Sequence, residues 1–357
     1  MTEEMTSKER LAAYSAGKTV DRIPYNTGLN ESAVTFYGYS NTDYLFSSDI
    51  MVDVEHRIIE EFGGDSIGFS INTRAFAEIA GSELEYRERG YSVIRNHIIP
   101  DKRSKRELKT IDVRKSGRLP IILDALKKAQ NDYGDELPVW YSLPCPANCA
   151  LGVTDLNTLL HFMLKDTAFF NKLMSYCLEA VLQIADRFYA ETGLTPGLFD
   201  VTAARQIMGR EQYETYVLPF VKKTVEGIRR ITKKTPPFST CGSQSHLWER
   251  LLEFEIPSLN IDCTDSITEA KDRVGSHIPI SGNIDGMAFL YMNDEQIDLM
   301  VKDTLLKASD SPQGFTLAIG GGPVAYGTAR QTMLVYRDSI LKYGAGARKG
   351  CLCEGLK

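Results

Sequence analysis

The chain has 357 residues, of which 43% are hydrophobic and 25% are charged, and its formal net charge is -6 at neutral pH. This composition is that of a globular protein with ample material for a core, which excludes an intrinsically disordered chain. Duplex binding depends on clustered lysine and arginine, so the acidic balance also argues against a nucleic-acid partner.

The start of the chain and its cysteines indicate a compartment. The chain begins Met1-Thr2-Glu3-Glu4 without an apolar segment after it, and no apolar run approaches the roughly 18 residues of a membrane span. Seven cysteines, an odd number spread over a long chain, do not resemble a disulfide framework. We therefore expect a cytoplasmic protein with free thiols and no membrane partner. The basic run over 102–106 is expected to be a solvated loop.

Apolar periodicity and turn signals divide most of the chain into alternating strands and helices. Thr6 and Glu9 have the spacing of a capping box, as do Thr328 and Gln331, so a helix is expected to begin at each place. The expected elements in chain order are a helix ending at 17, strand 21–26, helix 48–62, strand 65–70, helix 119–133, strand 137–142, helices 154–164 and 166–191, strand 197–200, helix 210–231, strand 237–241, helix 245–253, strands 258–262 and 277–282, helix 294–309, strand 315–320 and a last helix from 328.

Residues 80–112 interrupt this alternation. The segment 84–94 is rich in strand-forming residues and contains a turn signal at Arg89-Gly90, which predicts a β-hairpin. We interpret the segment as an insertion that decorates one end of the fold.

Eight strand candidates, each followed by a helix or a loop, predict an α/β fold of the closed (β/α)8 type, a TIM barrel. The barrel would span residues 1–357 as a single domain, with an N-terminal extension and the hairpin insertion near 80–112. Two smaller α/β domains are the alternative, but no linker rich in proline, glycine or serine separates two halves.

In such a barrel the active site lies at the C-terminal ends of the strands, so the strand endings are the candidate site. These endings are Asn26, Ser70, Asn72, Tyr141, Cys145, Asp200, Cys241, Asp262, Cys263, Asn283 and the glycine run 320–322. Polar groups gathered at one mouth indicate a ligand pocket. The alternative is that aspartates at strand ends cap the next helix or bind loop amides.

Several short motifs, taken in order, resemble the uroporphyrinogen decarboxylase superfamily, which contains the haem-pathway decarboxylase and the zinc-dependent cobalamin:coenzyme M methyltransferases. They lie at 6–10, 21–24, 62–65, 216–220, 241–242, 269–271, 282–285 and 320–322. The resemblance covers nearly the whole chain, and it implies a (β/α)8 barrel.

The decarboxylase branch of the superfamily implies groups that this chain lacks. Its N-terminal loop carries arginine, an aspartate follows its second strand, and a histidine lies near its last strand. Here the loop 26–31 has no arginine, Ile71 or Asn72 stands at the aspartate position, and the last strand runs into glycines 320–322. Decarboxylation of a tetrapyrrole with many carboxylates is therefore not expected.

The methyltransferase branch places zinc on a His-x-Cys pair and a distant cysteine. The matching pair here is Ser239-Thr240-Cys241, and the distant cysteine falls in the glycine run, so only Cys241 remains. Catalytic zinc normally takes three protein ligands. A zinc ion on Cys241 and Cys263 is the preferred rearrangement, and the remaining candidate ligands are Cys145, His246, Asp200 and Asp262. The opposing interpretation is that buried cysteines are small hydrophobes.

The resemblance implies a corrinoid-dependent methyltransferase component that moves a methyl group between a small substrate and a corrinoid protein. Methylcobalamin would arrive on that partner, because the chain has no Asp-x-His-x-x-Gly motif. The alternatives are a decarboxylase of a small acid or tetrapyrrole, and a non-catalytic small-molecule-binding barrel. A homodimer is compatible with the sequence. The expected site consists of catalytic Asp200, Tyr141 and Asn283, substrate-binding Asn26, Asn72, Asp262 and Gly321, and metal-binding Cys241 and Cys263.

Overall fold

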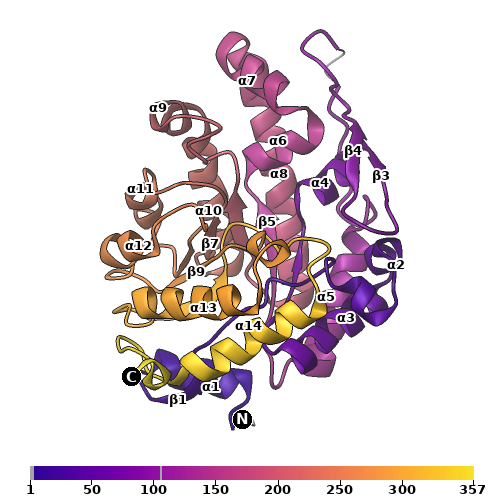
Figure 1. Cartoon of the computed structure of the whole chain (residues 1–357). Coiled ribbons are helices and arrows are strands. Elements are labelled where there is room, and N and C mark those ends of the chain that lie inside the picture. Colours follow the sequence, from indigo (N-terminus) through magenta and orange to yellow (C-terminus); the bar gives the residue numbers. More distant parts are fainter. Residues whose placement is uncertain (1–3, 105–106) are drawn as a thin grey trace.

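A computed structural model of the chain describes residues 4–104 and 107–357. The first three residues of the expected acidic start, and residues 105–106 of the basic run, lie outside the described residues. Seven parallel strands form the central sheet in the order β10-β9-β8-β7-β6-β5-β2, and helices surround it (Figure 1). The strands are β2 (Ile67–Ser70), β5 (Val139–Pro144), β6 (Gly197–Asp200), β7 (Phe238–Thr240), β8 (Leu259–Asn260), β9 (Ile280–Ile284) and β10 (Phe315–Ile319). The predicted α/β class is confirmed.

The first expected strand differs from the prediction. Its start forms β1 (Val20–Arg22), which pairs antiparallel with β11 (Ala345–Ala347), close to both chain ends (Figure 1). Its end makes one isolated parallel bridge, Tyr25 with Leu317 of β10. The carbonyl of Tyr25 also accepts a hydrogen bond of 3.0 Å from the backbone N–H of Asp65, just before β2. Pro24 lacks an N–H and cannot extend a regular ladder between β1 and Tyr25.

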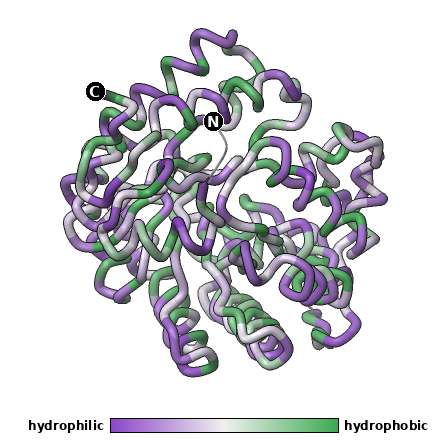
Figure 2. The backbone as a smooth tube through the Cα atoms, turned by 90° about the horizontal axis from the view of Figure 1, so that it is seen from below, coloured by the Kyte–Doolittle hydropathy of each residue, from purple (hydrophilic) through white to green (hydrophobic). Residues whose placement is uncertain are grey.

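Helices cover the outer face of the sheet. They are α1 (Ser7–Ser15), α2 (Asn41–Phe46), α3 (Ser48–Phe62), α4 (Thr73–Ala80), α5 (Leu119–Tyr133), α6 (Pro146–Val153), α7 (Leu156–Lys165), α8 (Thr167–Thr192), α9 (Arg210–Gln212), α10 (Leu218–Thr232), α11 (Trp248–Leu252), α12 (Ile267–Arg273), α13 (Asp294–Ala308) and α14 (Arg330–Tyr343). Figure 2 shows hydrophobic and hydrophilic positions alternating along the outer helices, as expected for helices with one face against a sheet.

Two helix predictions needed correction. The helix expected over 210–231 is divided into α9, a π-helical turn over Tyr213–Val217 and α10, which has Pro219 in its first turn. The capping box at Thr6 and Glu9 is confirmed, but the one expected at Thr328 is wrong. Ala329 is the N-cap of α14 and has no side chain that can accept a hydrogen bond.

The hairpin insertion is confirmed. Its strands β3 (Glu83–Glu85) and β4 (Val93–Asn96) pair antiparallel, apart from the central sheet, at one edge of the molecule (Figure 1). Within the described residues, none of the helices combines the length and the apolar character needed to cross a membrane.

Candidate active site at the ends of the parallel strands

Asp262 joins the loops that follow three of the strands. Its Oδ2 accepts a hydrogen bond of 2.6 Å from the N–H of Gly242, after β7. Its Oδ1 accepts bonds of 2.8 Å and 2.6 Å from the N–H and hydroxyl of Thr264. The carboxylate also lies against Gly321, after β10, where a Cβ would be 1.5 Å from Oδ2. Asp262 is only 4% exposed, and its hydrogen bonds hold these loops together.

Asn283 extends the same network at the end of β9. Its Nδ2 donates to the carbonyl of Asp265 at 2.9 Å and more weakly to that of Asp262 at 3.5 Å. The carboxylate of Asp265 accepts from the hydroxyl of Ser243 and from the N–H of Gln244, both at 2.8 Å. The fold therefore brings together Asp262 and Asn283, two of the predicted site residues.

Gln244 and Asp265 also belong to this network, although neither was predicted from the sequence. The side chain of Gln244 is fully buried, and its Nε2 donates to the carbonyls of Asp200 and Cys241. Its Oε1 has no partner among the described residues, which is a costly state for a buried acceptor. Neither residue belongs to a local motif, so only the fold identifies them.

Cys241 and Cys263 by themselves do not complete a catalytic zinc site. Burial, reinforced by the negative charges of Asp262 and Asp200, raises the pKa of the Cys241 thiol to about 12. Burial and the charges of Asp262 and Asp285 raise that of Cys263 to about 12 as well. Catalytic zinc normally takes three protein ligands, and across residues 4–104 and 107–357 no three histidine, cysteine, aspartate or glutamate side chains come together as a metal site. The zinc expected on Cys241 and Cys263 thus lacks a third ligand in the described chain.

Asp200, at the end of β6, lies in a closed network. Its Oδ1 accepts from the N–H and hydroxyl of Thr202 at 2.8 Å and 2.6 Å, and its Oδ2 accepts from the hydroxyl of Tyr213 at 2.8 Å. Burial raises the pKa of this carboxyl, although these hydrogen bonds oppose the shift. Because the side chain is fully buried, Asp200 anchors the loop after β6, and its catalytic role stays a prediction.

Tyr141 lies in β5 on the side that packs on the helices. Its ring contacts the ring of Phe188 in α8, with centroids 5.2 Å apart. The side chain is fully buried, and its hydroxyl has no hydrogen-bond partner among the described residues. Burial raises the pKa of the phenol well above its usual value. A catalytic role for Tyr141 stays a prediction.

The two predicted substrate-binding asparagines shape the backbone. The Oδ1 of Asn26 accepts from the N–H of Gly28 at 2.7 Å, which closes a turn. Asn72 is the N-cap of α4 and accepts from the N–H groups of Arg74 and Ala75 at 3.1 Å and 3.0 Å. A substrate-binding role for Asn26 and Asn72 stays a prediction.

A second polar cluster lies near the loops that follow Tyr25 and β10. Arg74, in the first turn of α4, forms an ion pair with the buried carboxylate of Glu31. The guanidinium also lies over the ring of Tyr91, 4.6 Å from its centroid. The hydroxyl of Tyr91 donates to the carbonyl of Val324 at 3.1 Å. Arg74 of α4 therefore places an arginine near the C-terminal ends of the strands, and its charge is paired with a carboxylate.

The motifs at 6–10, 21–24 and 62–65 form a buried ionic cluster. Arg10 donates to Asp21 at 2.6 Å and to Asp65 at 2.7 Å, and Arg22 donates to Asp65 at 2.7 Å. Asp65 also accepts from the N–H of Tyr25 at 2.9 Å. These residues join α1, β1 and the start of β2, so they stabilise the fold.

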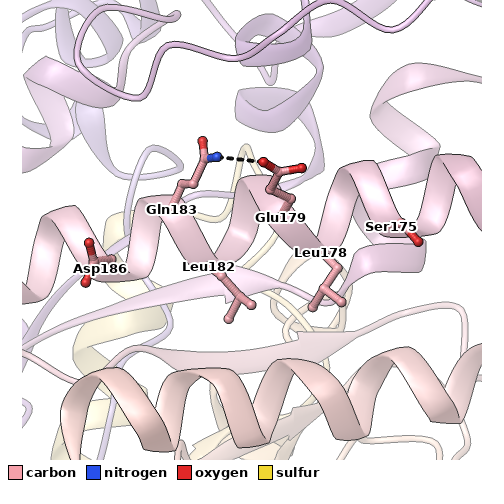
Figure 3. A pocket seen from close by; sticks show the side chains of 6 residues that line it. All are labelled: Ser175, Leu178, Glu179, Leu182, Gln183 and Asp186. Atoms are coloured by element: carbon pink, nitrogen blue, oxygen red, sulfur yellow. Dashed lines mark hydrogen bonds between the residues drawn. The ribbon is translucent and has the colours of Figure 1, made fainter.

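A surface hollow lies on the middle of α8, and none of the predicted site residues lines it (Figure 3). Leu178 and Leu182 line it together with polar side chains, among which Gln183 donates to Glu179 at 3.1 Å. Leu182 packs over Gly227 of α10, where a Cβ would be 2.5 Å away. All six residues that line the hollow belong to α8, so it contains none of the strand ends.

Known proteins match this chain over most of its length. A methylcobamide:CoM methyltransferase, MtbA, of Methanosarcina acetivorans is 26% identical over 301 residues, which are 81% of this chain and 85% of that protein. A uroporphyrinogen decarboxylase of Trichodesmium erythraeum is 25% identical over 210 residues, which are 57% of this chain and 58% of that protein.

A solved methyltransferase from Methanosarcina mazei has the same fold, with a TM-score of 0.77 at 16% identity, over 94% of this chain and 98% of that one. The family model described as uroporphyrinogen decarboxylase (URO-D) matches residues 6–341. Since the match spans nearly all of the chain, this protein belongs to the uroporphyrinogen decarboxylase (URO-D) family.

Proposed function

We propose that this protein is the methyltransferase component of a corrinoid-dependent system and acts as a single domain. It moves a methyl group between a small substrate and a corrinoid carried by a separate protein. The observation that carries the proposal is the similarity to the methylcobamide:CoM methyltransferase over 81% of this chain and 85% of that protein.

The side chains predicted for the site carry no positive charge, which favours methyl transfer over decarboxylation of a polycarboxylate. Cys241, Asp262 and Asn283 supply no positive charge. Arg74 is already bound to Glu31. A substrate with many carboxylates needs cationic partners, whereas a neutral methyl donor or acceptor does not.

The chain's own residues bind and orient the substrate. The methyl group moves without the electron pair of the bond that breaks, and the corrinoid on the partner is its donor or acceptor. Asn283 and Cys241 face the substrate, while Asp200, Asp262 and Gln244 hold the loops that carry them. Because the pKa of Cys241 is raised to about 12, its sulfur stays a protonated thiol and does not compete as a methyl acceptor.

A turnover assay with the full chain and free cobalamin tests this proposal. Methylcobalamin is mixed with coenzyme M in one arm, and reduced cobalamin with 2-methoxyphenol in the other, and the methylation state of cobalt is followed by absorbance. We expect cobalt-linked methyl transfer in at least one arm, lost in Asn283→Ala and kept in the exposed Ser276→Ala control.

The two alternative functions give different results in the same samples. Release of carbon dioxide from uroporphyrinogen, without cobalamin and without methyl transfer, would replace the proposal with a decarboxylase. A protein that binds small molecules but turns over neither substrate would instead be a binding barrel.

A further inference from the structure

A continuous row of side chains crosses the inner face of the sheet. The strand register pairs Thr316 with Ser281, Ser281 with Asn260, Asn260 with Ser239, and Ser239 with Phe199. We call these five residues the inner row. Barrels of this class usually fill their interior with valine, isoleucine and leucine, so a row of four small polar residues and one phenylalanine is unusual.

The residues of the inner row are more exposed than their neighbours along the strands. Its members are all partly exposed, while the residue before and the residue after each of them is buried. Alternate residues of a strand point to opposite faces, so the buried neighbours face the helices and the inner row faces the space on the inner side of the curled sheet. Cys241, Asp262 and Asn283 follow two residues after Ser239, Asn260 and Ser281, on the same face and nearer the C-terminal ends.

The hydrogen-bonding capacity of the inner row is only partly used. Asn260 donates its Nδ2 to the hydroxyl of Ser281 at 3.1 Å and to the carbonyl of Ile319 at 3.4 Å. The described residues provide no hydrogen-bond partner for the hydroxyls of Ser239 and Thr316. Together these groups offer free donors and acceptors, and the inner row carries no charge.

Trp140 faces the same space from β5. Pro144 pairs with Phe199, and Trp140 precedes Pro144 by four residues, so the indole shares the face of the inner row. The indole lies over Gly68, where a Cβ would be 2.0 Å from its Cε2, and its Nε1 donates to Ser66 at 3.1 Å. It remains 39% exposed, which is high for a tryptophan in a central strand.

Trp140 lies near the Thr316 end of the inner row. The backbone of Leu317, the residue after Thr316, is hydrogen-bonded to Pro24 and Asn26, which flank Tyr25. The carbonyl of Tyr25 accepts a hydrogen bond from the N–H of Asp65. Asp65 directly precedes Ser66, which binds the indole. Two strand spacings of about 4.8 Å therefore separate the backbone at Thr316 from the partner of Trp140.

We propose that Trp140 and the inner row form a binding site for a small, uncharged, planar molecule inside the sheet. The ligand would stack on the indole and hydrogen-bond through its edge to Thr316, Ser281 and Asn260. This inference rests on the proposed function and deepens it, because it places the small substrate on the inner face below Cys241 and Asn283. An aromatic ring with an oxygen-linked methyl group has the required chemistry.

The chain contains two tryptophans, which makes the test specific. Trp140 is half-exposed and Trp248 is fully buried, so ligand binding should change the emission of Trp140 alone. The probe is 2-methoxyphenol, titrated into the full chain and followed by fluorescence and by calorimetry. Binding should be seen by both methods, and Trp140→Phe should abolish the fluorescence change and weaken the calorimetric affinity. The anion 2-methoxybenzoate should bind at least tenfold more weakly.

A pair of matched variants tests the inner row itself. Thr316→Val removes the hydroxyl at nearly constant volume and should weaken the binding of 2-methoxyphenol about three- to tenfold. Thr268→Val makes the same change on the exposed side of α12 and should leave the affinity unchanged. No binding of the probe, or equal calorimetric affinity in wild type, Trp140→Phe and Thr316→Val, would overturn the proposed site. Because binding is read without cobalamin, failure of methyl transfer and failure of this site are separate results.

Discussion

The carboxylate of Asp262 lies where a side chain at residue 321 would stand. A Cβ on Gly321 would be 1.5 Å from Oδ2 of Asp262, and Gly321 has a φ of +82°, a conformation that other residues adopt at a cost. The loop after β10 therefore closes on the carboxylate that also holds Gly242.

We expect Gly321→Ala to lower the free energy of unfolding by about 2–4 kcal/mol, because it adds both a clash and backbone strain. Urea denaturation measures this. The neighbouring Gly322 is the control, since a Cβ there meets nothing within 4 Å, and Gly322→Ala should stay within about 0.5 kcal/mol of wild type. Equal stability of the two variants would contradict the close approach of Gly321 to Asp262.

Asp65 is predicted to be essential for stability. Asp65→Asn removes the negative charge that balances the buried guanidinium groups of Arg10 and Arg22. Such a loss typically lowers the free energy of unfolding by about 3–5 kcal/mol. Asp338→Asn is the control, because Asp338 pairs with Arg337 at the surface and should change stability by less than about 1 kcal/mol. A chemical denaturation series on both variants decides whether the ionic cluster stabilises the fold.

Glu55 is expected to make stability fall as the pH rises. Burial raises the pKa of this carboxyl in α3 to about 8, although the hydrogen bond from Tyr44 opposes the shift. In the unfolded chain a glutamate ionises near pH ~4.3, so between these values the folded state binds more protons. The stability present below the unfolded pKa is therefore lost as the pH approaches 8, by an amount on the order of 4 kcal/mol.

Glu55→Gln removes the ionisation and keeps an acceptor for Tyr44. We expect it to match wild type near pH ~4 and to be more stable near pH ~8, as measured by thermal unfolding across this range. Glu60→Gln, on the exposed side of the same helix, should keep the wild-type pH profile. Parallel profiles for wild type and Glu55→Gln would show that Glu55 is ionised in the folded protein.

Cys241 is expected to be a slow nucleophile that holds no zinc. With a pKa of about 12, it should be alkylated near neutral pH on the order of a hundred times more slowly than an unperturbed thiol, because the thiolate fraction falls more than the reactivity of the thiolate rises. Mass spectrometry after timed iodoacetamide treatment measures this rate. We further expect the zinc content of the purified protein to be the same in wild type and Cys241→Ser. About one zinc per chain that disappears in the variant would restore the zinc expectation.

Tyr141→Phe separates packing from catalysis. The hydroxyl is buried and unpartnered among the described residues, so its removal should leave stability unchanged or raise it by about 1 kcal/mol. Turnover in the cobalamin assay should also be retained, because the ring packs on Phe188 behind β5. Loss of turnover with intact stability would instead support the catalytic role predicted for Tyr141.

Much of the secondary structure follows from local sequence. The helix expected over 119–133 is α5, and the strand expected over 197–200 is β6, since apolar periodicity and nearby turn signals act within a few residues. The second capping box failed because a Thr-x-x-Gln spacing does not fix the dihedral angles, and the chain enters α14 one residue later. The short α6 was missed because it lies between a strand and a longer helix.

The candidate site was predicted only in outline. Parallel strands place their C-terminal ends together, so the sequence correctly brought Asp262, Asn283 and the glycine run to one edge. It could not tell that Asp200 and Tyr141 are buried against Tyr213 and Phe188, because the direction of a side chain depends on strand register and on partners far away in the chain.

The sequence by itself determined the α/β class, the family resemblance and the set of strand endings, because each depends on local pattern and order along the chain. Only the tertiary structure decided which groups are charged, paired or open. The raised pKa of Cys241, the position of Asp262 against Gly321 and the open inner row all come from burial and from contacts between strands distant in sequence. Local pattern carries no information on these contacts, because desolvation and hydrogen bonding depend on neighbours in space.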